Sequence, residues 1–125
     1  MSTQVTKSEK MLKKCLTVLT MVLFSLTFAQ QSGKASWYGI PHHGRKAADG
    51  SVFNMNAMTC ASNTHALGSK LKVTNKENGK SVIVKVTDRG GFTKLGRIID
   101  LSKGAFSQIA STSKGIITVL VEVVD

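Results

Sequence analysis

The chain has 125 residues, one proline, two cysteines and a formal net charge of +10. This length excludes more than one domain of ordinary size, and two cysteines exclude a disulfide-rich scaffold. The positive charge favours a polyanionic partner such as cell wall, anionic lipid headgroups or nucleic acid, and it suits a solvated basic face equally well.

The first element along the chain is an apolar segment near the N-terminus. Lys13 and Lys14 precede an unbroken run of apolar and hydroxyl residues over 15–29, and polar residues follow. A basic start, an apolar run of this length and a small residue at its end are typical of a secretory signal peptide, and the run is too short for a membrane span. We therefore expect residues 1–29 to be a cleaved leader and residues 30–125 to be the secreted domain. A single anchoring helix is the alternative.

This leader has consequences for the rest of the chain. Cys15 stands at the start of the apolar run, whereas a lipoprotein cysteine follows such a run, so we expect no lipid anchor. The residues before Met11 add no recognisable element, so translation starts at Met1 or Met11. Loss of Cys15 leaves Cys60 alone, and no disulfide can form within the domain. The domain keeps 13 basic and six acidic residues, a net charge of +7, and we expect it in the periplasm or cell envelope.

Short strands follow the leader. Residues 33–39 read as the first strand. The clearest element is a β-hairpin over 69–88, in which apolar residues alternate with polar ones on either side of a turn that contains Asn78-Gly79. Residues 97–102 form a short buried strand, Ser102 is the expected N-cap of a short helix, and residues 115–125 form the last strand. Five or six strands with one or two short helices favour a small closed β-barrel.

Residues 33–101 resemble the rare lipoprotein A (RlpA) family almost throughout. The segments that carry the resemblance are "GKASWYG", "HHGRKAADGSVFNMNAMT", "LGSKLKVTNKENGKSVIVKVTDRGGF" and "GRIIDLS". The resemblance implies a mainly β fold, a small six-stranded double-psi β-barrel with one or two short helices, and kinship with expansins. It also implies lytic transglycosylase activity on peptidoglycan glycan strands, with a preference for strands stripped of stem peptides.

The resemblance assigns the family's acid to Asp88 in "TDRGG". Three positions depart from the family pattern. Ser51 stands where the family has a glutamate, Ser62 where it has a histidine, and Gly91 where it has a proline, which should loosen that turn. The loss of the glutamate and histidine is expected to slow the reaction.

One carboxylate can suffice for this chemistry. Hydrolytic glycosidases usually need two. In lytic transglycosylation the muramic C6 hydroxyl attacks its own anomeric carbon, so the nucleophile arrives with the substrate. Asp88 can then act as acid and as base, provided that burial raises its pKa and that neither Lys85 nor Arg89 pairs with it. The alternative for Asp88 is a turn cap ahead of Gly90.

Other carboxylates and one histidine compete for a role. Asp49 is a candidate replacement for the glutamate lost at Ser51, and His65 for the histidine lost at Ser62. The alternatives are an ordinary turn at Asp49 and a solvated loop histidine at 65. Asp100, flanked by apolar residues, is expected to be structural and to satisfy backbone donors in the barrel.

Aromatic and basic side chains supply candidates for substrate binding, namely Trp37, Tyr38, Phe92 and Arg89. Aromatic faces suit sugar rings, although core packing explains large aromatics equally well. Strand alternation sends Trp37 and Tyr38 to opposite faces, and we favour Tyr38 for the groove.

Several other functions find little support. A hydrolase built on Cys60 and His65 competes with the interpretation of Cys60 as a small apolar residue. His42 and His43 are adjacent and cannot easily share one tetrahedral metal ion, so we expect no metal and no cofactor. Charge alone does not indicate nucleic acid, and we expect a monomer. The serious rival is a non-catalytic, expansin-like binder of wall glycan, which explains the charge, the aromatics and the two serines; wall binding without any product would identify it.

Overall fold

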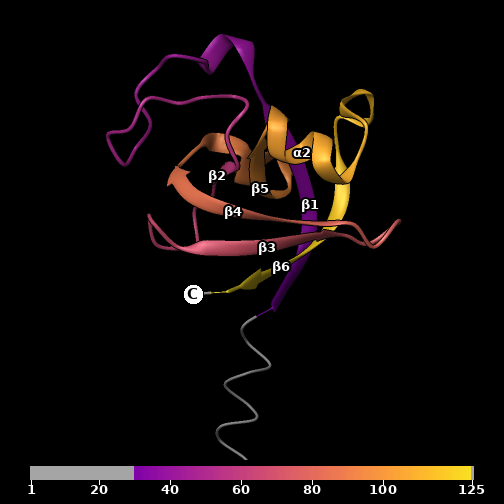
Figure 1. Cartoon of the computed structure of the whole chain (residues 1–125). Coiled ribbons are helices and arrows are strands. Elements are labelled where there is room, and N and C mark those ends of the chain that lie inside the picture. Colours follow the sequence, from indigo (N-terminus) through magenta and orange to yellow (C-terminus); the bar gives the residue numbers. More distant parts are fainter. Residues whose placement is uncertain (1–29, 125) are drawn as a thin grey trace, which may run out of the picture. The chain divides into compact units, whose positions relative to one another are not determined.

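The computed structural model describes residues 30–124 (Figure 1). The expected leader, residues 1–29, lies outside the described residues. Within 30–124, no helix has the length and apolar character needed to cross a membrane.

Six strands form a closed barrel in the order β1-β5-β2-β4-β3-β6, which confirms the expected mainly β fold. The strands are β1 (Gln30–Tyr38), β2 (Thr59–Ala61), β3 (Lys70–Asn75), β4 (Ser81–Asp88), β5 (Arg97–Ser102) and β6 (Ile117–Val123). The helical elements of the described part are α2 (Lys103–Ile109) and the 3₁₀ helices η1 (Ile40–His42), η2 (Gly91–Leu95) and η3 (Thr112–Lys114). β2 was not predicted, because a strand of three residues is too short to show a periodic pattern.

The barrel combines parallel and antiparallel strand pairs. β1 pairs with β5 and β2 pairs with β4 in parallel, whereas β2–β5, β3–β4 and β3–β6 are antiparallel pairs. Because β2 lies between β5 and β4, residues from three distant parts of the chain meet on one stretch of barrel wall.

The barrel interior is filled by alternate strand residues. Its fully buried members include Cys60 of β2, Val86 of β4 and Leu101 of β5, and Phe106 of α2 packs against them. Burial of such side chains is the main source of stability in a domain this small. Gly104 at the start of α2 is required by close packing, since a Cβ there would lie 2.7 Å from the Asn56 carbonyl oxygen.

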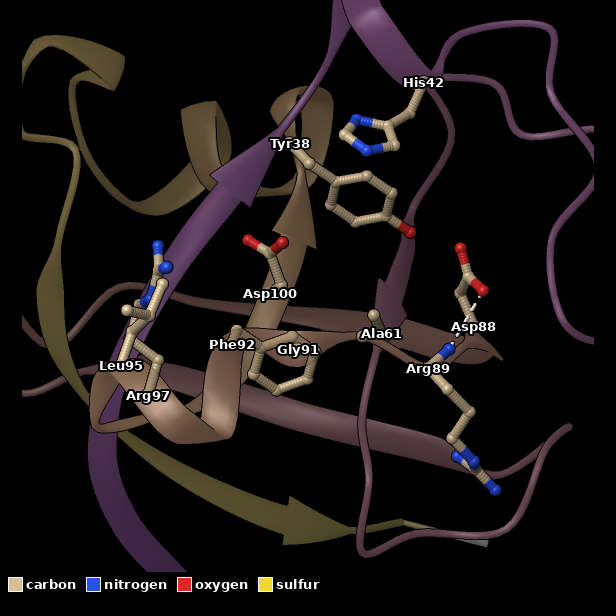
Figure 2. Close-up of a pocket in the computed structure, with 11 residues that line it drawn as sticks. Tyr38, His42, Ala61, Asp88, Arg89, Gly91, Phe92, Leu95, Arg97 and Asp100 are labelled. Atoms are coloured by element: carbon tan, nitrogen blue, oxygen red, sulfur yellow. Dashed lines mark hydrogen bonds between the residues drawn. The ribbon is translucent and has the colours of Figure 1, made fainter.

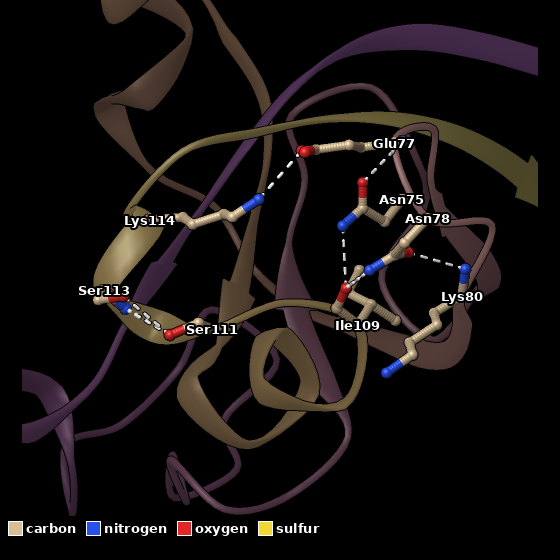
Figure 3. A network of polar contacts seen from close by, with 8 residues as sticks. All are labelled: Asn75, Glu77, Asn78, Lys80, Ile109, Ser111, Ser113 and Lys114. Carbon is tan, nitrogen blue, oxygen red and sulfur yellow. Dashed lines mark hydrogen bonds and ion pairs between the residues drawn. The ribbon is translucent and has the colours of Figure 1, made fainter.

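The β3–β4 hairpin is fastened to the end of α2 by a polar network (Figure 3). The side-chain amides of Asn75 and Asn78 both donate to the Ile109 carbonyl oxygen, each at 2.9 Å. Lys114 and Glu77 form an exposed ion pair at 3.1 Å beside them. The asparagines thus satisfy a carbonyl that the end of a helix would leave without a partner.

Candidate active site

One row of register partners crosses four neighbouring strands of the barrel wall. Ser36 of β1 pairs with Asp100 of β5, Asp100 pairs with Ala61 of β2, and Ala61 pairs with Asp88 of β4. Laterally paired residues point to the same face of a sheet. This face is opposite the barrel core, because Cys60, the neighbour of Ala61, belongs to the core. The two carboxylates are therefore two strand spacings apart, about 10 Å between Cα atoms, with a small alanine between them.

A β-bulge brings Asp88 into this row. Cys60 pairs with Val86, and the register then shifts so that Ala61 pairs with Asp88 and not with Thr87. Strict alternation would point Asp88 the same way as Val86, toward the core. The extra residue turns Asp88 to the outer face, as bulges beside active sites often do.

Three members of the row, Ala61, Asp88 and Asp100, line a cavity of about 210 Å³. Figure 2 shows its lining, which consists of Tyr38, His42, Ala61, Asp88, Arg89, Gly90, Gly91, Phe92, Leu95, Arg97 and Asp100. Tyr38, Ala61 and Phe92 also pack with Phe53 in a small apolar cluster separate from the barrel core. The cavity thus combines an apolar wall with acidic and basic groups, as ligand sites do.

Asp88 is held by the backbone around it. Its Oδ1 accepts hydrogen bonds from the backbone N–H groups of Ala48 at 3.0 Å and Arg89 at 2.9 Å. Asp88 therefore anchors the loop before β2 and also borders the cavity. These contacts are compatible with a turn cap and with a catalytic acid.

The Arg89 side chain points away from the cavity (Figure 2). Its guanidinium donates to the carbonyl oxygens of Ser62 and His65, the latter at 2.7 Å. It therefore fixes the 62–65 loop and does not pair with Asp88. Arg89 is among the residues that line the cavity, while its guanidinium is bound to the 62–65 loop.

Asp100 also lines the cavity. Its Oδ1 accepts a 2.8 Å hydrogen bond from the Ser36 hydroxyl, and not from backbone donors. Burial raises the pKa of the Asp100 carboxyl, while the Ser36 hydrogen bond and the charges of Arg97 and His42 oppose that rise. The signal that could have found it is alternation: Ile99 and Leu101 point to the core, so Asp100 points outward.

Tyr38 provides a hydroxyl without a partner at the edge of the row. The residue is 9% exposed, and its hydroxyl makes no hydrogen bond of normal geometry among the described residues, although Thr87 lies near enough to oppose the rise of the phenol pKa. Burial raises the pKa of the phenol, and the charges of Asp88 and Asp100 raise it further. In Figure 2 the hydroxyl points toward Asp88. It is a protonated donor available to a ligand.

Trp37 and Tyr38 lie on opposite faces of β1, as strand alternation predicts. Trp37 packs against the barrel core and donates from Nε1 to the Thr112 carbonyl oxygen at 3.0 Å. Tyr38 stacks on Phe53, with ring centroids 4.3 Å apart, and Phe92 forms part of the cavity wall. The structure thus brings Tyr38 and Phe92 together at the cavity and leaves Trp37 on the other face.

Ser51 and Ser62, which stand where the family has a glutamate and a histidine, do not line the cavity. Asp49 and His65, the candidate replacements for those two residues, do not line it either. Asp49 accepts hydrogen bonds from the Ser51 hydroxyl at 2.5 Å and backbone N–H at 2.9 Å, which lower the pKa of this exposed carboxyl. The Ser62 hydroxyl lies 2.9 Å from His65 Nδ1. Burial and the charge of Arg89 lower the pKa of His65. Each pair forms a local network within its own loop.

The remaining candidates are also placed by the fold. Cys60 is fully buried in the core, and burial raises its pKa to about 12, so its environment does not suit a nucleophile. His65 contacts Ser62 and Thr64 and makes no recorded bond to Cys60. His43 accepts from the Met55 backbone N–H at 3.1 Å. Within residues 30–124, no three potential metal ligands gather.

Solved structures identify the class of this barrel. It is similar to the Streptomyces papain inhibitor, with a TM-score of 0.62, 23% identity and coverage of 77% of this chain and 94% of that one. It is similar also to an apo expansin of Clavibacter michiganensis, with a TM-score of 0.61, 25% identity and coverage of 77% and 50%. The domain is a double-psi β-barrel.

Within this class, the chain belongs to the lytic transglycolase family, whose profile matches residues 30–121. A probable endolytic peptidoglycan transglycosylase RlpA of Synechocystis is 49% identical over 94 residues, which is 75% of this chain and 29% of that protein. The endolytic peptidoglycan transglycosylase RlpA of Campylobacter jejuni is 49% identical over 92 residues, covering 74% and 33%. The chain therefore spans about a third of the length of these relatives, and the RlpA resemblance is confirmed.

Proposed function

We propose that the protein is an endolytic peptidoglycan lytic transglycosylase that cleaves glycan strands and leaves anhydro-muramic ends. The observation that carries the proposal is the row in which Asp88 and Asp100 flank Ala61, since all three residues line one cavity. The names of the relatives, endolytic peptidoglycan transglycosylases, support the same reaction. Its substrate lies in the cell envelope, where we infer that the protein acts.

Asp100 is the better-suited proton donor. Its pKa is raised by burial, so its carboxyl holds a proton at a higher pH than an exposed aspartate does. In the reaction, the bond between muramic C1 and the glycosidic oxygen breaks, and Asp100 gives its proton to that leaving oxygen. The muramic O6 forms the new bond to C1, and the C6 hydroxyl releases its proton.

Asp88 is suited to receive that second proton. Two backbone N–H groups donate to its Oδ1 and fix the orientation of the carboxyl group. The Tyr38 hydroxyl, a donor without a partner, supplies a hydrogen bond to a sugar oxygen between the two acids. This division uses Asp88 as base and adds Asp100 as acid, where the sequence analysis gave Asp88 both roles. It uses neither Ser51 nor Ser62.

The test is product analysis by mass spectrometry after incubation of the purified protein with peptide-free glycan strands. Anhydro-muramic ends are expected from the wild type and neither from Asp88→Asn nor from Asp100→Asn. Asp49→Asn is the matched control, since Asp49 is an exposed carboxylate outside the cavity lining. If no variant and no wild-type sample gives products while all bind glycan equally, the protein is a wall-glycan binder of the expansin type.

Export through a cleaved leader is a separate part of the proposal. The basic and apolar pattern of residues 1–29 supports it. N-terminal sequencing of the protein recovered from envelope fractions should give Gln30 as the first residue, and recovery of an uncleaved chain would contradict cleavage.

A further inference from the structure

A guanidinium without an ionic partner borders the cavity beside Asp100. Arg97 is half-buried, and its Nε is shielded from solvent without a hydrogen-bond partner among the described residues. Among the described residues, Arg97 makes no ion pair with Asp100 or with Asp88. A shielded donor that lacks a partner costs free energy, and sites that bind ligands retain such groups.

The position of Arg97 depends on a second β-bulge. Lys34 of β1 pairs with Arg97, and the register then shifts so that Ala35 pairs with Ile99. Ile98 is the extra residue. In a strand without a bulge, Arg97 would point to the opposite face from Asp100, which lies three residues further on. Because the bulge takes up one residue, both side chains border the same cavity (Figure 2).

We propose that Arg97 binds the free carboxylate of the lactyl ether on the muramic residue and so selects glycan strands without stem peptides. This inference rests on the proposed function, because it takes peptidoglycan as the substrate. In a peptide-free strand of alternating N-acetyl sugars, the lactyl carboxylate is the anionic group. In a peptide-bearing strand, the same carbon is a neutral amide.

The chemistry of the site fits a carboxylate better than a neutral group. A guanidinium binds carboxylates through two parallel hydrogen bonds, and it stays charged when partly buried. Asp88, on the far side of Ala61, repels a second negative charge, so the carboxylate is directed to the Arg97 end of the cavity. Recognition at this end therefore also sets the direction in which the strand crosses the acids.

The test measures binding in full-length protein carrying Asp88→Asn, which prevents cleavage. Three probes are compared: peptide-free strands, the same strands with their lactyl carboxylates converted to methylamides, and peptide-bearing strands. We expect at least about tenfold tighter binding to the free carboxylate, the size of one charge-assisted hydrogen-bonded contact. Added Arg97→Gln should abolish this preference by weakening binding to the free strands alone, and Arg97→Lys should retain part of it.

Lys80→Gln is the matched control, because it removes the same charge from an exposed position outside the cavity lining. It should keep the preference. Equal binding of free and amidated strands, equal weakening of both by Arg97→Gln, or tighter binding to peptide-bearing strands would overturn the inference. Unfolding midpoints of the variants establish that each is folded.

The same proteins with Asp88 intact separate this inference from the proposed reaction. A preserved tenfold preference without anhydro products would refute the reaction and leave the recognition by Arg97 standing. Anhydro products formed at equal rates from free and amidated strands would support the reaction and refute the recognition by Arg97.

Discussion

Asp88 and Asp100 share one register partner, Ala61, which pairs with the first in parallel and with the second in antiparallel fashion. A larger side chain at this position would fill the space between the two carboxylates. We expect Ala61→Leu to abolish glycan cleavage and binding, while overpacking lowers the free energy of unfolding by about 1–3 kcal/mol. Ala61→Ser, with little added volume, should retain activity. Full activity in the leucine variant would show that the strand does not pass between the acids.

The Asp100 carboxyl should make stability depend on pH. Its pKa is raised in the folded protein by burial, so its contribution is fully present below its unfolded pKa and is lost as pH rises through the folded value. Asp100→Asn keeps an acceptor for the Ser36 hydroxyl and removes the charge. We therefore expect the variant to gain stability relative to wild type between about pH 3.5 and about pH 7. Thermal unfolding at both pH values measures this, and a constant difference would contradict it.

Tyr38→Phe separates a binding role from a packing role. The phenol oxygen is buried without a partner among the described residues, so its removal should leave the free energy of unfolding unchanged or raise it by up to about 1 kcal/mol. If the hydroxyl donates to a sugar oxygen, glycan cleavage should fall about tenfold or more. Unchanged cleavage rates would assign Tyr38 to the apolar wall alone.

Asn75 should matter for stability and not for activity. The residue is 1% exposed, and its side-chain amide donates to the Ile109 carbonyl oxygen. We expect Asn75→Ala to lower the free energy of unfolding by about 1–3 kcal/mol in urea titrations. Asn78→Ala should cost less, because Asn78 is exposed and Asn75 would still satisfy the same carbonyl. Equal losses in both variants would show that the two bonds are not redundant.

Cys60 should resist alkylation in the native protein. The thiol is fully buried, and its pKa of about 12 leaves almost no thiolate at neutral pH. Iodoacetamide is expected to leave glycan cleavage unchanged and to modify Cys60 only after unfolding in urea. Inactivation of the folded protein by alkylation would revive the cysteine hydrolase hypothesis.

Much of the barrel could be predicted from local patterns. Alternation with an Asn-Gly turn defines the β3–β4 hairpin, and the Ser102 hydroxyl caps α2 by accepting from the Ala105 backbone N–H at 3.1 Å, as expected. β2 could not be found, because three residues carry no period. Its place between β4 and β5 is determined by tertiary pairing.

The candidate site was predicted only in part, because local sequence patterns do not show which strands lie side by side. Asp88 and Tyr38 were identified, and both line the cavity. Alternation with Ile99 and Leu101 indicates that Asp100 points outward, but it does not show which strands lie beside it. The position of Arg97 depends on the bulge at Ile98, so the sequence did not predict that these two residues line the cavity. Asp49 and His65 were sought as replacements near Ser51 and Ser62, but each bonds to that serine in its own loop.

Because Asp88 and Asp100 both pair with Ala61, the barrel wall fixes the distance between their backbones. The separation of the two Asp Cα atoms is set by the hydrogen-bond spacing of the main chain, while the loop that carries Ala48 orients the Asp88 carboxyl group. Other loops around the cavity can therefore change length and composition, and with them the sugars admitted, while the reacting groups keep their distance. Conversely, a slip of β2 by one residue would replace Ala61 with Cys60 between the acids and misalign both at once.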